Sequence, residues 1–212
     1  MWRLTAFIGG LLSLWIAVAS PLADMDHHLL TAHMVQHLLL MTVAAPLIVL
    51  GASDRLKGFG GTLIHPLFCW LAGTAVVIGW HVPTLFELGM RSKGWHEFEQ
   101  ATFLAAGLLF WWPVVQPSLA RMPRWSVPLY LFLATLPCDA LSAFLTFCGR
   151  VVYPHYLSAP RAFDLSPLAD QELAGALMWV WVTFAYLVPA GVVTIQMLSP
   201  KRRASTEVAQ IS

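Results

Sequence analysis

Charged residues are scarce in this chain of 212 residues. Asp, Glu, Lys and Arg make up 11% of it, while 58% of the residues are hydrophobic; an ordinary soluble domain has about 25% charged residues. The formal net charge is +1 and the longest basic run is Lys201-Arg202-Arg203, which argues against nucleic acid as a partner. The composition indicates an integral membrane protein whose surroundings are the lipid bilayer.

Cysteine is also rare, and its spacing excludes the usual roles of cysteine in small folds. The three cysteines are Cys69, Cys138 and Cys148, with no Cys-x-x-Cys pair among them. A disulfide framework and a cysteine-based zinc site are therefore excluded. The chain also lacks a phosphate-binding loop and a convincing Ser-His-Asp arrangement, and we expect a protein that is not an enzyme.

Six apolar segments approach or exceed the ~20 residues that cross a bilayer as a helix. They span residues 4–23, 29–51, 62–80, 98–115, 127–148 and 168–198. The alternation typical of a membrane β-barrel is absent. The sequence therefore predicts an all-α, polytopic membrane helical bundle with about six transmembrane helices. We expect one transmembrane domain over residues 1–198 and a short cytoplasmic tail over residues 199–212.

The basic residues alternate between the loops on the two sides of this predicted bundle. Eight of the 12 lysines and arginines fall on the side that holds both termini, and four fall on the other. The positive-inside rule then predicts a multi-pass protein of the bacterial inner (plasma) membrane with both termini cytoplasmic. On this topology seven of the eight histidines lie on the outer side, and only His65 is cytoplasmic.

The N-terminal segment also fits a second interpretation. Arg3, a short apolar run and the small residues Ala17-Val18-Ala19-Ser20 are typical of a cleavable signal peptide. The apolar stretch continues to Ala23, which favours a retained helix. Either way the second helix keeps its orientation, and the histidines stay outside.

The second apolar segment begins with the strongest candidate site. His33, His37 and Met41 are spaced by four residues, so in a helix they form one stripe about 12 Å long, with Met34 on its flank. Imidazole within lipid demands a partner or a ligand, and thioether is a soft ligand that selects Cu(I). The stripe therefore predicts a Cu(I) site, although the histidines of a purely structural scaffold would satisfy one another.

Other groups on the outer side can complete such a site. His81 ends the third segment and is either a water-facing residue or an inward ligand, while His96 and Glu99 lie three residues apart, as a local pair does. Asp170 falls in the first turn of the last helix, where an acidic residue complements the helix dipole. The candidate ligands are thus His33, His37, Met41, His81 and His96, with Met34, Glu99 and Asp170 as groups that orient them.

Two further acidic positions receive weaker interpretations. The loop Asp24-Met25-Asp26-His27-His28 has a ligand-like composition, but we expect its residues to be solvated and to form a weak capture site at most. Asp139 lies within the fifth segment, where a carboxylate requires a partner or a proton. The sequence offers no partner for it.

At this point several segments resemble a known family. The run His33 to Met41, followed by Ala45-Pro46-Leu47 and Gly51, is similar to the signature helix of the CtaG-like cytochrome c oxidase assembly factors. Later segments resemble the same family in the same order, and together they cover most of the chain: His96–Glu99, Phe110–Pro113, Tyr153-Pro154 with Tyr156, and Asp170–Gly175 with Met178-Trp179.

The resemblance implies a membrane protein that helps a haem-copper oxidase to mature by handling copper for its active centre. It implies Cu(I) as the cofactor or cargo, a transient complex with an oxidase subunit, and a soluble copper donor. The family's His-x-x-x-His pair is kept as His33 and His37. Its frequent histidine after the glutamate of the fourth helix is replaced by Gln100, which leaves His96 and Glu99 there. An extra N-terminal helix of longer members is not evident.

Two other function classes fit parts of the same pattern. A haem-binding redox protein would use His33 or His37 with His81 as axial ligands. A copper permease would need donors that continue through the membrane, and the sequence offers Asp139 and Met178, with Cys69 or Cys138.

Overall fold

Every regular element in the described part of the chain is helical. The computed structural model describes residues 1–53, 65–118, 120–160 and 163–199. The elements are α1 (Trp2–Ala19), α2 (Pro21–Met25), α3 (Leu30–Leu38), the π-helix η1 (Leu39–Ala44), α4 (Ala45–Ala52), α5 (Pro66–His81), α6 (Pro83–Arg91), α7 (Lys93–Val115), α8 (Ser126–Phe147), α9 (His155–Ser158) and α10 (Pro167–Leu198). The predicted all-α class is confirmed.

The number of membrane-crossing helices depends on one bend. Within the residues that the structure describes, five helical spans are long and apolar enough to cross a membrane. The pair α5 and α6, bent by 77°, raises this number to six if it counts as one span. These are the features of a membrane protein. The plasma membrane and the cytoplasmic termini stay predictions, since Arg55, Lys57 and the tail from residue 200 onward lie outside the described residues.

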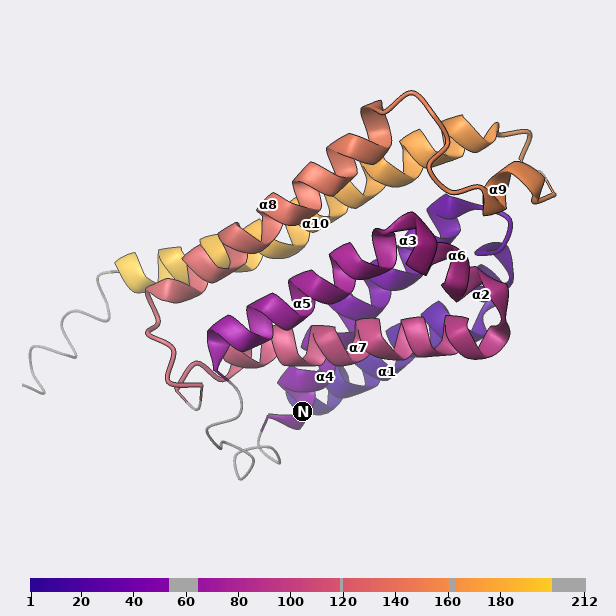
Figure 1. Cartoon of the computed structure of the whole chain (residues 1–212). Helices are drawn as coiled ribbons and strands as arrows, with labels where there is room; N and C mark the ends of the chain where they lie inside the picture. The colour runs from indigo at the N-terminus through magenta and orange to yellow at the C-terminus, as the bar shows by residue number, and fades with distance from the viewer. Residues whose placement is uncertain (54–64, 119, 161–162, 200–212) are drawn as a thin grey trace, which may run out of the picture.

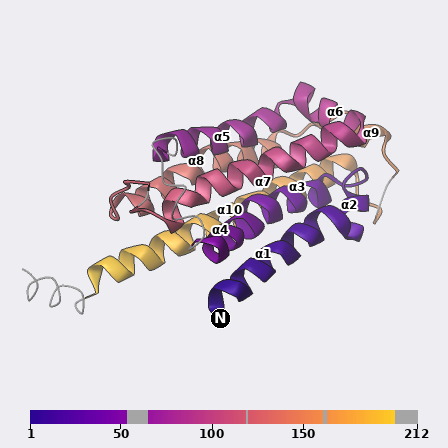
Figure 2. The same cartoon turned by 90° about the horizontal axis from the view of Figure 1, so that it is seen from below.

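The long helices run along one common axis, and the short ones gather at one end. The pairs α8 with α10, α5 with α7, and α1 with α4 pack side by side, and α3 packs against α10 (Figure 1). The short helices α2, α6 and α9 lie at one end of the bundle, whereas α1 begins and α10 ends at the opposite end (Figures 1 and 2). We call the end with α2, α6 and α9 the short-helix end.

Helix α6 was not predicted, and a proline accounts for it. The third apolar segment was expected over residues 62–80; residues 62–64 lie outside the described part, and α5 ends at His81. Val82 is extended, with φ −66° and ψ 125°, as a residue before proline prefers, and Pro83 then begins a new helix at its first position. The chain therefore turns over the short-helix end.

The second span, made of α3, η1 and α4, contains a π-helical turn that forms a hydrogen bond with α7. Ala45 donates its N–H to the carbonyl of Leu40, five residues back. In this register the next donor would be Pro46, which has no N–H. The carbonyl of Met41 instead accepts a hydrogen bond from Nε1 of Trp111 at 2.9 Å. The π-turn therefore frees a carbonyl that joins the second span to the fourth.

A glycine lets these two helices approach each other. A Cβ atom on Gly107 of α7 would lie 2.8 Å from Cβ of Ala45 and 3.0 Å from Cα of Met41, closer than packed atoms tolerate. Half of the most apolar window is buried in each of these two spans, against 17% in the first span. The second span and α7 therefore form the centre of the bundle.

We expect Gly107→Ala to lower the free energy of unfolding by about 1–3 kcal/mol, because the added methyl group pushes α7 away from the π-turn. The measurement is the temperature at which the detergent-solubilised protein loses its size-exclusion peak. Gly79→Ala on α5 is the matched control, since its Cβ would meet nothing within 4 Å. Equal melting of Gly107→Ala and the unsubstituted protein would contradict the close packing.

Asp170 of α10 caps the N-terminus of α3. Leu29, at the N-cap of α3, has no side-chain cap, and the Asp170 carboxylate accepts hydrogen bonds from the N–H of Leu30 at 2.6 Å and of Thr31 at 3.1 Å. The Thr31 hydroxyl donates to the same carboxylate at 2.6 Å. A carboxylate here satisfies free helix donors and complements the helix dipole. It thereby positions the first turns of α3.

Loss of this cap is expected to lower stability. Asp170→Ala removes the acceptor of these hydrogen bonds and should lower the free energy of unfolding by roughly 1–2 kcal/mol. Asp170→Asn should lose less, because its amide oxygen still accepts. Thermal unfolding in detergent measures both, with the exposed neighbour Glu172→Ala as the control. A fully stable Asp170→Ala variant would rule out the capping role.

Candidate metal centre

Three histidines and two carboxylates meet, buried, at the short-helix end of the bundle. Each of these five side chains is at most 7% exposed. They are Asp26, His33, His37, His96 and Glu99. They come from the loop after α2, from α3 and from α7. His65, in contrast, precedes α5 at the other end of the bundle.

His33, His37 and Glu99 converge from α3 and α7. Oε1 of Glu99 lies 3.4 Å from Nε2 of His33 and 3.7 Å from Nε2 of His37, and the two imidazole centroids are 4.3 Å apart. Two ligands bonded to one ion at ~2.0–2.1 Å lie about 3.3–3.6 Å apart in tetrahedral or trigonal geometry. The 3.4 Å separation falls in this range and the 3.7 Å separation lies just above it, so the three side chains are close enough to bind one ion.

The same three side chains lack hydrogen bonds. Among the described residues, neither ring nitrogen of His33 or His37 and neither oxygen of Glu99 has a hydrogen-bond partner. Buried polar atoms are almost always paired, and each exception calls for a specific cause such as an ion. Together with the spacing, these atoms without hydrogen-bond partners form a group that could hold a metal ion; we call His33, His37 and Glu99 the carboxylate centre.

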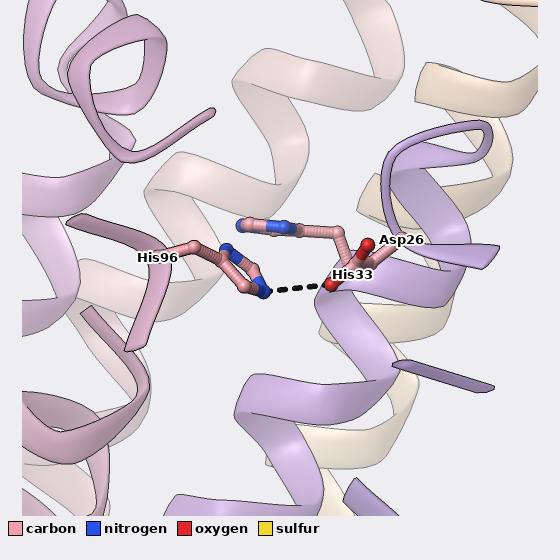
Figure 3. Close-up of side chains that lie close together, drawn as sticks. All are labelled: Asp26, His33 and His96. Carbon is pink, nitrogen blue, oxygen red and sulfur yellow. Dashed lines mark ion pairs between the residues drawn. The ribbon is translucent and has the colours of Figure 1, made fainter. Parts of the chain in front are cut away.

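A second group adjoins this centre and shares His33 with it. Nε2 of His96 lies 2.7 Å from Oδ2 of Asp26 (Figure 3), and Nδ1 of His96 lies 3.5 Å from Oε2 of Glu99. One ligand atom each from Asp26, His33 and His96 lies within 4.8 Å of the others. Burial alone would raise the pKa of Asp26, but the adjacent His96 imidazole lowers it below its ordinary value. Asp26 is therefore an ionised donor.

Aromatic residues cover the carboxylate centre. Phe86 of α6 lies 4.9 Å from the His33 ring and stacks on Tyr153 at 4.0 Å. The hydroxyl of Tyr156, on α9, donates to the carbonyl of Asp26 at 2.7 Å. Helix α6 and residues 150–156, which we call the covering segment, thus close over the centre and separate it from water.

Gln171 holds this covering segment, a role that the sequence did not reveal. Its Oε1 accepts a hydrogen bond from the N–H of Val152 at 2.7 Å, and its Nε2 donates to the carbonyl of Arg150 at 3.0 Å. Nothing in the sequence distinguishes it from a solvated residue in the first turn of α10. Only the path of the covering segment brings its partners together.

The structure corrects the interpretation of Asp26. We expected its loop to be solvated, but Asp26 is 1% exposed because the loop folds under α9 and faces His96. Glu99 was expected to orient a ligand, but its carboxylate lies close enough to His33 and His37 to bind the same ion. The neighbouring His27 and His28 were the sequence signal that singled out this loop.

The predicted thioether and His81 lie in a different group. Met41, Met34 and His81 line a cavity of about 30 Å³ that His37 also lines. His81 is 7% exposed, so it faces inward and not toward water, while its role as a ligand stays a prediction. The donors thus divide into two groups, with His37 common to both.

Asp170 and Asp139 lie outside both groups of potential donors. Asp170 binds the backbone of α3, as described above. Asp139 is half-buried, and its Oδ1 has no hydrogen-bond partner among the residues that the structure describes. Gln100, at the position of the family's frequent histidine, places its amide 2.7 Å from Nε2 of His96.

Comparison with known proteins agrees with the resemblance noted in the sequence. The chain is 24% identical to the uncharacterized protein ML1998 of Mycobacterium leprae over 98% of this chain and 35% of that relative. It is 25% identical to the uncharacterized protein Mb0105 of Mycobacterium bovis over 84% of this chain and 31% of the relative. The chain therefore spans about a third of the length of these curated relatives. No solved structure matches it.

The family model described as cytochrome c oxidase caa3 assembly factor (Caa3_CtaG) matches residues 1–199. This match covers nearly the whole chain, including the carboxylate centre and its aromatic cover. The chain belongs to the cytochrome c oxidase caa3 assembly factor family.

Proposed function

We propose that this assembly factor binds copper at the carboxylate centre and passes it to a subunit of cytochrome c oxidase. One observation carries the proposal: His33, His37 and Glu99 are buried side by side. Their polar atoms are close enough to bind one ion, and they have no hydrogen-bond partners among the described residues. Copper is here the cargo of the protein. Binding and transfer of an ion require no bond-making chemistry, so we propose that the protein is not an enzyme.

The donor set favours copper among the metals available in a cell. Imidazole suits copper, zinc and iron, and among divalent ions a given set of nitrogen and oxygen donors binds copper most tightly. Membership of an oxidase assembly family supports the same choice. The Cu(I) preference expected from Met41 belongs to the other donor group and is taken up below.

The position of the centre suits transfer on one side of the membrane. Asp26, in the loop after α2, and His96 form the group next to the carboxylate centre, and His33 belongs to both groups. An ion captured by Asp26 and His96 from a soluble donor reaches His37 and Glu99 by exchange of one ligand at a time. An oxidase subunit in transient contact with the short-helix end would then take the ion by the same kind of exchange.

The geometry favours this function over haem binding. The cavity between His37 and His81 has a volume of about 30 Å³, whereas pockets for organic ligands have about 300–1,000 Å³. A porphyrin held between these two histidines would require the helices to separate.

The geometry also favours transfer over permeation through the bundle. Deeper along the bundle axis, the ring of Phe110 packs against Tyr130 at 4.9 Å and Tyr186 at 5.3 Å. The Tyr130 hydroxyl donates to the carbonyl of Phe110 at 2.9 Å. These packed aromatic rings present no chain of metal donors toward the opposite end.

Removal of the central ligands should abolish copper binding. We expect near-stoichiometric copper in protein purified anaerobically in detergent from copper-replete cells, and its loss in the double variant His33→Ala/His37→Ala. Glu99→Gln keeps the shape of the side chain but removes its charge, and should weaken copper binding at least about 10-fold. Elemental analysis for copper, zinc and iron measures the content of each protein.

The matched control for these variants is His65→Ala, which removes a histidine from the opposite end of the bundle and should leave the copper content unchanged. Iron in place of copper would favour the haem alternative. Protein without metal, or copper retained by the double variant, would contradict the carboxylate centre.

Delivery is tested in cells. In a strain that lacks its own copy of this assembly factor, the unsubstituted chain should restore the copper content of the oxidase, and Glu99→Gln should not, because the ion is no longer held for transfer. The measurement is copper per haem in the purified oxidase, with His65→Ala as the control. An oxidase with full copper in the Glu99→Gln strain would show that transfer does not pass through this centre.

A further inference from the structure

A ring nitrogen of His81 that carries no proton faces the sulfur atom of Met34. Its Nδ1 lies 2.7 Å from the carbonyl oxygen of Val77, and because a carbonyl only accepts, Nδ1 carries the proton. In the neutral ring Nε2 is then an unprotonated acceptor, and it lies 3.3 Å from Sδ of Met34. Thioether sulfur has no proton to donate. Two acceptors thus face each other in the core with no hydrogen between them.

This arrangement is that of two ligands of one ion. Metal-bound histidines usually donate their second ring N–H to a carbonyl or carboxylate, as His81 does to Val77. With metal bonds of about 2.0 Å to nitrogen and 2.3 Å to sulfur, tetrahedral ligands lie about 3.5 Å apart, close to the observed 3.3 Å between Nε2 and Sδ. A packing contact between a histidine and a methionine does not require this tautomer.

Further soft donors surround the same point. The cavity of about 30 Å³ is large enough for one ion, since about 10–15 Å³ already holds a water molecule. Its lining brings potential donors from five elements, α3, η1, α5, α8 and α10: they are Met34, His37, Met41, His81, Cys138 and Met178. Its other walls are largely apolar, with Val77, Phe103 and Val182 among them.

We propose that this cavity is a second metal site, selective for a soft monovalent ion of the Cu(I) class. Three thioethers and imidazole without a carboxylate select Cu(I) over zinc or other divalent ions. An apolar wall also favours the ion of lower charge. We call it the thioether site. It rests on the proposed function only for the identity of its natural ion as copper, because its donor set is independent of Glu99.

His37 connects the two sites. It lies 3.7 Å from Glu99 in the carboxylate centre and also lines the cavity with Met34 and Met41. Cu(I) can therefore pass between the sites by exchanging Glu99 and His33 for thioether ligands while His37 stays bound. This transfer involves no change of oxidation state and no further reactant.

The first test is X-ray absorption at the copper edge on the full chain in detergent, loaded anaerobically with one equivalent of Cu(I). We expect sulfur neighbours at about 2.3 Å from copper. A spectrum with nitrogen and oxygen neighbours only would overturn the proposal. This outcome does not depend on any variant, so it holds even if a substituted protein fails to fold.

The second test uses substitutions that keep the volume of the core. Met34→Leu/Met178→Leu should weaken Cu(I) binding at least about 10-fold, measured by competition with a chromogenic Cu(I) chelator, and should remove the sulfur signal. The control is Met90→Leu/Met122→Leu, two methionines that are also buried, each at 7% exposure, and that do not line the cavity. Unchanged Cu(I) affinity in Met34→Leu/Met178→Leu would also overturn the thioether site.

Failure of the two proposals gives different results. Glu99→Gln should lose divalent copper and keep the sulfur neighbours of Cu(I), because the cavity retains its donors. If Glu99→Gln changes no metal binding while the sulfur signal persists, the carboxylate centre is wrong and the thioether site stands. If the sulfur signal is absent while Glu99→Gln loses divalent copper, the thioether site is wrong and the carboxylate centre stands.

Discussion

The contact between the second span and α7 decides where the metal-binding candidates lie. The π-turn at Leu39–Ala44 frees the carbonyl of Met41 for Trp111, and Gly107 allows the two backbones to approach. With this contact in place, Glu99 of α7 faces His33 and His37 of α3. A shift of α7 by one residue would turn Glu99 away by about 100°, and the imidazoles would lose their carboxylate.

The burial of His33, His37 and Glu99 gives their missing hydrogen bonds a functional meaning. Polar atoms enclosed among apolar helices are destabilising unless they are paired, yet those of His33, His37 and Glu99 lack hydrogen bonds among the described residues. The carboxylate of Asp170 is equally enclosed, but it accepts hydrogen bonds from the start of α3. The contrast with Asp170 favours binding over a purely structural role for the three side chains.

Much of the fold and part of the site could be predicted from the sequence. The long apolar segments correspond to the long helices, and the spacing of His33 and His37 places both on one face of α3, because helical periodicity is a local property. The depth of Asp26 could not be predicted, because the exposure of a loop depends on what folds over it. The separation of Met41 from Glu99 likewise depends on how α5, α8 and α10 pack around η1.

The sequence by itself determined the helical membrane class, the family resemblance and the pair of histidines at the start of the second span. All three follow from composition, hydrophobic length and local spacing, which require no partner in space. Only the tertiary structure decided which potential donors lie together. Glu99 and Asp26 join the histidines, while Met34 contacts His81 and Met41 lines the same cavity, because each group combines side chains from helices far apart in the chain.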